Sequence, residues 1–150
     1  MLFNNIQIYS RVDGELVSNF RMREFQNTQG WVILHEKVPW ALEMTRAALN
    51  ARYPTWLIQI LVTNCTRTRA QNESLARRLG WADEGGTVSR ESFHLVEFGG
   101  IAADFVAYST ARKIRIPAKE VADIAALYFD YVKWYSDDHV HGDFRKLVQP

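Results

Sequence analysis

An acidic residue interrupts one of the most apolar stretches of this chain. Asp104 lies within residues 100–107, Gly-Ile-Ala-Ala-Asp-Phe-Val-Ala, whose composition predicts a β-strand. A carboxylate buried in such a strand is costly unless a cation or a hydrogen-bond donor accompanies it. Three of the chain's four histidines lie in the same C-terminal third, at His94, His139 and His141. We therefore expect the fold to bring imidazoles to Asp104.

Histidine and aspartate in this combination indicate a catalytic zinc site. Such sites use three protein ligands and leave a fourth position for water, and imidazole and carboxylate suit that role. The candidate ligands are His94 in a loop, Asp104 on a strand and His141 on a final strand. Side chains two residues apart on a strand point the same way, so His139 is an alternative ligand to His141. The chain has no helical His-Glu-x-x-His pair, which argues against the helix-based metalloprotease pattern.

Hydrophobic periodicity predicts an α+β domain spanning residues 1–150, with a small antiparallel sheet and helices packed on one side. Strands are expected at 5–9, 56–62 (a central strand), 101–108 and 138–145, and helices at 39–53, 69–79 and 117–135. Residues 16–25 are expected to form a short turn, capped by Ser18 or Asn19. The segment 26–37 is predicted as a loop that tucks Trp31 against the body. The aromatic residues of 128–135 are assigned to the core.

Composition limits the classes of partner. A net charge of +1 argues against duplex nucleic acid, which usually binds a clear basic excess. The single cysteine, Cys65, cannot form an internal disulfide and is expected to be an inert packed thiol. The N-terminus lacks the pattern of a signal peptide, and no apolar run approaches the roughly 20 residues of a membrane helix. We expect a soluble monomer, made in the cytoplasm, with no nucleic-acid or membrane partner.

Several ordered segments resemble one known family. Three segments, in this order along the chain, are similar to motifs of the zinc D-Ala-D-Ala carboxypeptidases. Ser92-Phe93-His94 resembles the family's Ser-x-His, Gly100 to Phe105 its Gly-x-Ala-x-Asp, and His139 to Arg145 the strand that carries its last histidine. That group includes phage endolysins that cut the L-Ala–D-Glu bond of peptidoglycan peptides, and its fold is shared with the hedgehog signalling domain. Residues 62–72, in which an Arg precedes an Asn by five, and residues 20–25, Phe-x-x-x-Glu-Phe, resemble further segments of the family.

The resemblance implies a hedgehog-like or DD-peptidase-like fold with Zn²⁺ held by His94, Asp104 and His141. One departure leaves an alternative open. The glycine of Gly-x-Ala-x-Asp usually falls three residues after the first histidine, whereas Gly100 falls six after His94 and Glu97 stands at the expected position. Either the loop carries an insertion, which costs little entropy, or Glu97 replaces the first ligand.

The resemblance also implies roles for residues around the metal. Arg67 would bind the substrate carboxylate or the developing oxyanion, for which a guanidinium is a suitable donor. His139 would be the general base or a transition-state donor. Asp138 is the rival base, because some family members place an acidic residue three positions before the last ligand. Ser92, Asp143 and Arg145 are candidates to support the ligands by hydrogen bonds.

These inferences predict a zinc metallopeptidase that hydrolyses a bond of the peptidoglycan stem peptide. A phage or prophage lysis enzyme, released through a holin or associated with the virion, fits a chain without a signal peptide. Two alternatives are a non-catalytic binding or virion-structural module that retains the fold, and a peptidase for the D-Ala-D-Ala dipeptide. A nuclease is least favoured, because the charge is close to neutral.

Overall fold

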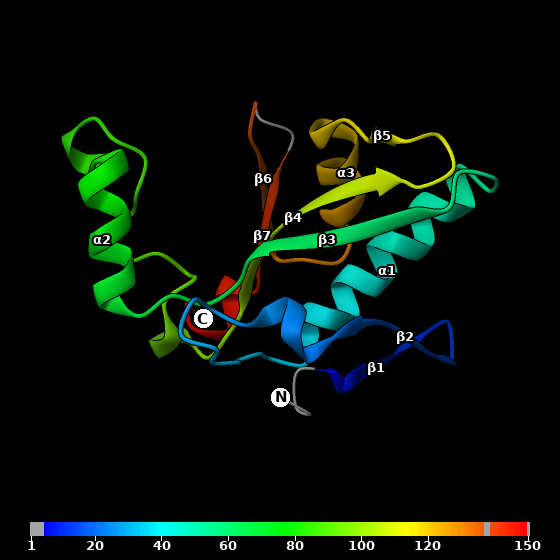
Figure 1. Cartoon of the computed structure of the whole chain (residues 1–150), viewed down its shortest axis with the longest axis horizontal. Coiled ribbons are helices and arrows are strands. Elements are labelled where there is room, and N and C mark those ends of the chain that lie inside the picture. The colour runs from blue at the N-terminus through cyan, green and yellow to red at the C-terminus, as the bar shows by residue number, and fades with distance from the viewer. Residues whose placement is uncertain (1–4, 137–138, 150) are drawn as a thin grey trace.

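The computed structural model describes residues 5–136 and 139–149. Its regular elements alternate between strands and helices along the chain (Figure 1). In order they are β1 (Gln7–Val12), β2 (Glu15–Arg21), a 3₁₀ turn (Met22–Phe25), α1 (Lys37–Arg52), β3 (Ile58–Asn64), α2 (Arg69–Leu79), two 3₁₀ turns (Ala82–Glu84 and Val96–Phe98), β4 (Ala102–Ser109), β5 (Ile114–Arg115), α3 (Ala118–Ala125), β6 (Tyr131–Trp134), β7 (Val140–Asp143) and a final 3₁₀ turn (Arg145–Leu147).

The strands form two antiparallel sheets, so the predicted α+β class is confirmed. β1 and β2 make a hairpin that turns at Asp13-Gly14, and the larger sheet has the order β3-β4-β7-β6, with β5 also paired to β4. β4 is therefore the central strand. β3, for which the sequence predicted the central place, lies at one edge of this order.

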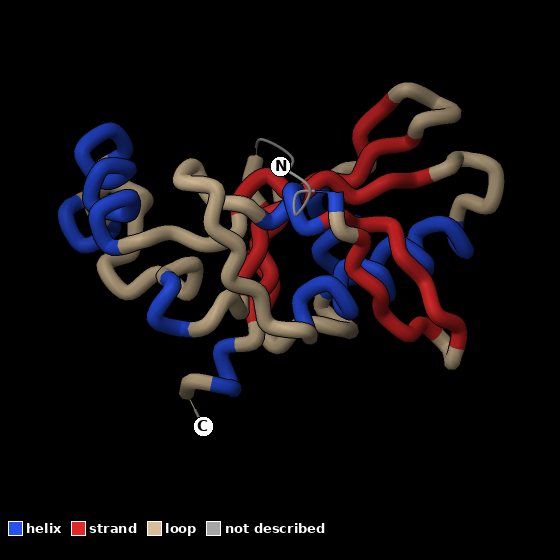
Figure 2. The backbone as a smooth tube through the Cα atoms, turned by 60° about the horizontal axis from the view of Figure 1, so that its bottom comes forward, coloured by secondary structure: helices blue, strands red, loops and turns tan. Residues whose placement is uncertain are grey.

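The core lies between the larger sheet and the helices α1 and α3, which pack on the same face (Figures 1 and 2). Side chains of β4 alternate between its two faces, and those of Ala103, Phe105 and Ala107 enter this core. Asp104, between them, projects from the opposite face. The site face of the larger sheet is thus the face that α1 and α3 leave uncovered.

Helix α2 stands apart from the rest of the molecule (Figure 1). Only Asn72 and Ala76 of this helix are buried, and the Asn72 side-chain amide donates to the carbonyl of Ser89 in the loop that follows. Gly80 ends the helix with a φ of +78°, and a Cβ on Gly86 would lie 2.2 Å from the Gly80 carbonyl carbon. Residues 69–91 therefore form a small unit of their own, which we call the α2 lobe.

The predicted helix from Pro117 to Tyr135 is wrong in its second half. α3 ends at Ala125, and Tyr131–Trp134 form strand β6, which pairs with β7. Between the two, Phe129 enters the core and stacks on Phe105 at 5.8 Å between ring centroids. The run Tyr-Val-Lys-Trp suits a strand edge, and pairing with β7 decided its conformation over its local periodicity.

The prediction for residues 16–25 is also wrong in part. Phe20 and Phe25 are buried as expected, but Ser18 and Asn19 lie in strand β2 rather than at a helix cap. The Ser18 hydroxyl donates across the hairpin to the carbonyl of Ile8, and Asn19 donates to the buried carboxylate of Glu43. Residues 26–36 precede α1 without forming a helix or strand, but Trp31 is 52% exposed and not packed against the body.

The final strand is shorter than predicted, because β7 covers only Val140–Asp143 of the expected 138–145. None of the described helices combines the length and the apolar character that a membrane span requires.

Candidate metal centre

Neighbouring strands bring two of the three predicted ligands together. Asp104 of β4 is the direct register partner of His141 of β7, so the two side chains share the site face of the sheet. His94 arrives from the loop that precedes β4. A parallel bridge holds this loop beside Arg67, with hydrogen bonds from the Arg67 amide to the His94 carbonyl (2.7 Å) and from the Val96 amide to the Arg67 carbonyl (2.9 Å).

The three side chains present one ligand atom each to a common point. His94 Nε2, Asp104 Oδ1 and His141 Nδ1 lie 3.0 Å from one another in every pairing. Ligand atoms at the corners of a tetrahedral zinc site with bonds of about 2.0–2.1 Å are about 3.3 Å apart. The described set is close to that spacing, so these residues could hold a metal ion.

In each histidine ligand the ring nitrogen that faces away from the ligand triangle, called the outer nitrogen below, shows where a proton lies. His94 Nδ1 is 2.5 Å from the carbonyl oxygen of Cys65, and His141 Nε2 is 2.7 Å from Asp143 Oδ2. Both oxygens can only accept, so each outer nitrogen carries a proton. The inner nitrogens then present lone pairs beside a carboxylate oxygen. Three acceptors this close repel one another unless a proton or a metal ion lies among them.

Asp143 is itself fixed by Arg145. The Arg145 side chain donates to Asp143 through Nε (2.9 Å) and Nη2 (2.8 Å), and the Arg145 backbone amide donates at 3.0 Å. The guanidinium is stacked between two rings, 4.4 Å from the centroid of Phe93 and 3.5 Å from that of Tyr131. The orientation of His141 is therefore set by a chain of contacts through Asp143 and Arg145.

The ionisable groups respond to this packing. Burial lowers the pKa of His141, but hydrogen bonds to the carboxylates of Asp104 and Asp143 outweigh burial and raise it above its ordinary value. Burial raises the pKa of Asp104, and the two histidines reverse that effect and hold it below its usual range. The Cys65 thiol is buried, which raises its pKa to about 12, as an inert packed thiol requires.

Glu97 does not join the cluster. Its side chain is 43% exposed and forms an ion pair with Arg69 at 2.8 Å. His94, by contrast, is 3% exposed and lies within the ligand triangle. His94, and not Glu97, therefore joins Asp104 and His141 in the structure.

The other predicted site residues have different positions. The Arg67 guanidinium donates to Ser92 Oγ at 2.9 Å, and burial lowers its pKa in spite of the opposing charge of Asp104. His139 is half-buried, and its ring stacks on Tyr135 with 4.2 Å between centroids. Asp138, the rival base, lies outside the described residues.

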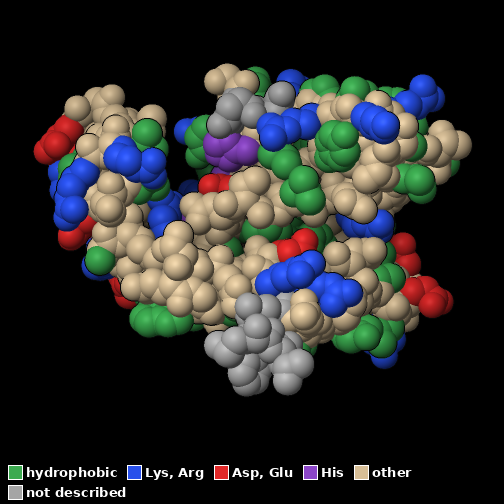
Figure 3. All heavy atoms as spheres, viewed as in Figure 1, with side chains coloured by type: hydrophobic (Ala, Val, Ile, Leu, Met, Phe, Trp, Pro, Cys, Tyr) green, Lys and Arg blue, Asp and Glu red, His purple; other side chains and the backbone are tan. Residues whose placement is uncertain are grey.

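A cleft of ≈ 680 Å³ opens over the ligand triangle. Its walls come from the α2 lobe on one side and from β6 and β7 on the other, and Figure 3 shows the hollow between the lobe and the rest of the molecule. Arg67, His139 and all three ligands line this cleft, together with Tyr131, Lys133 and Tyr135.

The two tyrosines and Lys133 are site residues that the sequence analysis missed. They were assigned to an amphipathic helix, whereas Tyr131 and Lys133 lie on strand β6 and share one of its faces. The alternation Tyr131, Lys133, Tyr135 is the signal that could have placed all three on the site face. The assignment of Tyr131 and Tyr135 to the core was wrong.

Comparison with known proteins gives no family for this chain, since it matches no family model, no curated protein and no solved structure.

Proposed function

We propose that this protein is a metal-dependent peptidase, with zinc as the metal, and that it hydrolyses a peptide bond of the peptidoglycan stem peptide. One observation carries the proposal: His94 Nε2, Asp104 Oδ1 and His141 Nδ1 converge at 3.0 Å on the floor of a cleft. Three protein ligands with an open side are the arrangement of catalytic zinc sites, whereas structural zinc sites are closed by four.

The donor set suits a hydrolytic site. Two imidazoles and a carboxylate, without thiolate, would hold the ion, and a bound ion supplies Lewis acidity and lowers the pKa of water. Cys65 does not compete as a ligand, because its thiol is protonated and contacts the carbonyl of Ala102 at 3.5 Å. The outer contacts to the Cys65 carbonyl and to Asp143 direct the inner nitrogens of both histidines towards the metal position.

Arg67 is the group that we assign to substrate binding. Its guanidinium lines the cleft with the ligands and is held by Ser92 Oγ, which also accepts from the amide of His94 at 3.3 Å. The arginine is therefore fixed to the same loop as a metal ligand. A fixed guanidinium can bind a substrate carboxylate or stabilise negative charge that develops on a carbonyl oxygen.

His139 is the residue that we assign to proton transfer. It lines the cleft two residues before His141, and the stack on Tyr135 restricts its ring. A neutral imidazole beside the reacting bond can take a proton from water and return it to the leaving amine. Asp138 remains the second candidate for this role.

The size of the cleft favours a peptide over a dipeptide. Its ≈ 680 Å³ falls within the range of about 300–1,000 Å³ for pockets that bury drug-sized ligands. Half-exposed rings and the ammonium of Lys133 extend its wall beyond the ligand triangle along β6. We therefore favour a substrate that extends past the scissile bond, as a stem peptide does.

The test combines metal analysis with a hydrolysis assay. Purified chain would be stripped with a chelator, reloaded with one equivalent of zinc and incubated with purified peptidoglycan, with a stem tetrapeptide or pentapeptide, and with D-Ala-D-Ala. We expect new amino groups from the first two substrates, dependence on zinc, and a loss of more than about 10³-fold in the rate for Arg67→Ala or His139→Ala.

The possible failures of this test are distinguishable. Zinc binding without hydrolysis of any substrate would refute the peptidase and favour a binding module. Hydrolysis of D-Ala-D-Ala alone would favour a dipeptidase. A chain that takes up no metal would refute the metal centre itself.

A further inference from the structure

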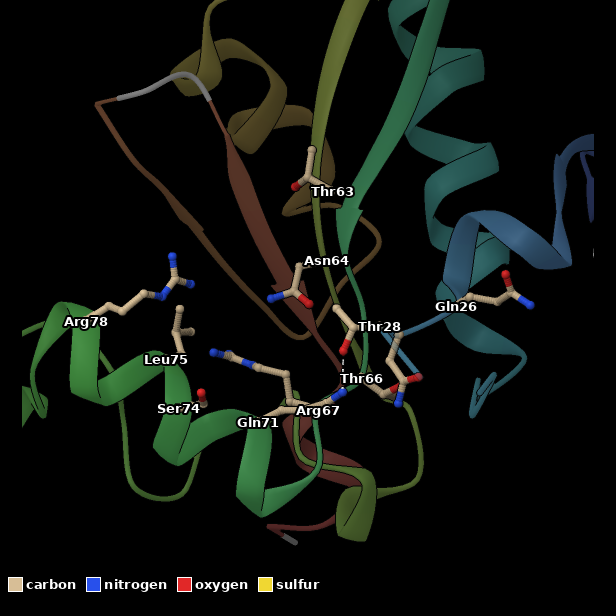
Figure 4. Close-up of a pocket in the computed structure, with 11 residues that line it drawn as sticks. Gln26, Thr28, Thr63, Asn64, Thr66, Arg67, Gln71, Ser74, Leu75 and Arg78 are labelled. Carbon is tan, nitrogen blue, oxygen red and sulfur yellow. Dashed lines mark hydrogen bonds between the residues drawn. The ribbon is translucent and has the colours of Figure 1, made fainter. Parts of the chain in front are cut away.

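A second pocket adjoins the metal cleft, and apart from Arg67 its residues have no role in the function proposed above. It encloses ≈ 340 Å³ and lies between α2, the end of β3 and the loop after Phe25 (Figure 4). It shares Asn64, Arg67 and Leu75 with the metal cleft, so Arg67 stands in the wall between the two cavities.

One face of α2 supplies the outer wall of this pocket. Gln71, Ser74, Leu75 and Arg78 recur at helical spacing and all line it. Figure 4 shows Arg78 extending from α2, while Arg67 extends from the segment between β3 and α2. Two guanidinium groups thus border one small cavity, and none of the described residues that line it is an aspartate or glutamate.

Arg78 has no oppositely charged partner in the part of the chain that the structure describes. No ion pair or hydrogen bond joins the Arg78 side chain to another residue of the described ranges 5–136 and 139–149. Its neighbours on the lobe differ, because Arg69 is paired with Glu91 and Glu97, and Arg90 with Asp83 and Glu84.

The wall also contains hydrogen-bond donors that lack an acceptor. Among the described residues, buried polar atoms without a partner include Asn27 Nδ2, Thr66 Oγ1 and Arg67 Nε, and all three residues line this pocket. The assignment of the Asn27 amide is secure, because its Oδ1 accepts from the backbone amides of Gln29 (2.9 Å) and Trp31 (3.0 Å). Leaving a buried donor unpaired is costly, so such groups mark what is missing from a site.

We propose that this pocket is a binding site for an oxyanion, a carboxylate or a phosphate group of a ligand. The anion is held between Arg67 and Arg78, and its oxygens accept from the unpaired donors of Thr66, Asn27 and Arg67. A sugar without charge is a poorer match, because no aromatic side chain lines the cavity. The site does not depend on the proposed hydrolase activity. Its position beside Arg67 places the anion next to the metal cleft.

The test measures binding directly on the full chain in the presence of a chelator, so that no metal can ligate the anion. The probes are sodium phosphate and sodium acetate, with sodium chloride at equal ionic strength as the reference. The readout is the NMR signal of the Arg67 Nε–H group. We expect a saturable shift of this signal with phosphate or acetate and none with chloride. The probe that binds more tightly shows whether the natural ligand offers a phosphate or a carboxylate group.

Two arginines on α2 provide a matched pair of variants. Arg78→Gln is expected to weaken anion binding about tenfold, the cost of one charge-assisted hydrogen bond. Arg77→Gln removes the same charge at the preceding residue of the helix, and Arg77 does not line the pocket. This variant is expected to change the affinity for the anion less than twofold. If both variants weakened anion binding equally, the loss of affinity would come from the general surface charge, and the proposal would be overturned.

Thr66→Val supplies an independent test, since it keeps the shape of the side chain and removes the hydroxyl. Thr66 is 2% exposed, and its hydroxyl has no hydrogen-bond partner within residues 5–136 and 139–149. We expect the ligand-free variant to melt about 2–4 °C higher, because an unpaired polar group is removed, and to bind the anion more weakly than the unaltered chain. A lower melting temperature, or unchanged affinity, would overturn the proposed role of this hydroxyl. The absence of a saturable shift with every probe would overturn the site.

Discussion

The Nε2 atom of His141 lies 2.7 Å from Asp143 Oδ2, and this contact determines which nitrogen of the imidazole faces the metal centre. The carboxylate accepts a hydrogen bond from Nε2–H, so the lone pair of Nδ1 faces Asp104 and His94. The contact lies entirely within β7, because side chains two residues apart share a face of the strand.

Asp143→Asn is expected to lower zinc affinity by about 10–100-fold. The amide can donate to Nε2, which would move the imidazole proton to Nδ1 and close the ligand position. Competition with a chromogenic chelator would measure the affinity. Asp123→Asn removes an exposed carboxylate paired with Lys119 and serves as the control, with no change expected. Equal zinc affinity in both variants would show that Asp143 does not orient His141.

His94→Gln and Glu97→Gln separate the two candidates for the first ligand. Because His94 lies in the triangle and Glu97 is paired with Arg69, the first variant is expected to reduce zinc affinity by at least about 100-fold and the second by less than twofold. Isothermal titration with zinc would measure both. The reverse order would mean that the acidic residue is the ligand and that the loop takes another conformation when metal binds.

The metal-free protein should lose stability as the pH rises from about 6.5, the ordinary pKa of histidine. The pKa of His141 is raised in the folded state, so its protonation stabilises the fold below the unfolded-state pKa, and this stabilisation disappears as the pH rises through the folded-state value. Urea unfolding in chelator at several pH values between 5.5 and 9 would measure the effect. His141→Gln should remove it, and a variant with the unaltered pH dependence would exclude His141 as the group responsible.

Gly142→Ala should destabilise the fold by about 1–3 kcal/mol. A Cβ at this position of β7 would lie 2.9 Å from two atoms of the Phe129 ring, closer than packed atoms tolerate. The loss would appear as a lower urea midpoint with an unchanged dependence on denaturant concentration. Phe129→Leu in the same chain should recover part of the loss, because the smaller side chain vacates the contact. A double variant less stable than the sum of the two single losses would argue against this explanation.

Some features could be predicted because their signals are local. The helix over residues 69–79 was predicted with its observed bounds, since its residues favour a helix and Gly80 ends it. Asp104 attracted attention for a similar reason, since a carboxylate in an apolar strand needs a partner wherever the strand lies. His94 and His141 were candidates from their residue type and position, the resemblance favoured His141 over His139, and the structure brings His94 and His141 to Asp104.

Other features are decided by contacts between distant parts of the chain. Residues 131–134 have an apolar pattern compatible with a helix, and they form β6 because β7 offers hydrogen bonds and Phe129 is drawn into the core. The tyrosines of this segment therefore line the cleft. The sequence of residues 117–135 does not show where β7 lies, so periodicity alone could not decide whether residues 131–134 form a helix or a strand.

By itself, then, the sequence determined the chemistry at single positions: which side chains can ligate a metal, which stretches are apolar, and where Gly80 and the Asp13-Gly14 turn interrupt the chain. The tertiary structure alone decided the rest. Three features depend on residues far apart in the chain or on how residues pack. They are the register that sets Asp104 opposite His141, the histidine proton positions fixed by the Cys65 carbonyl and Asp143, and the pocket between Arg67 and Arg78. Strand register and side-chain hydrogen bonds depend on the whole packed arrangement, and for that reason no local pattern in the sequence contains them.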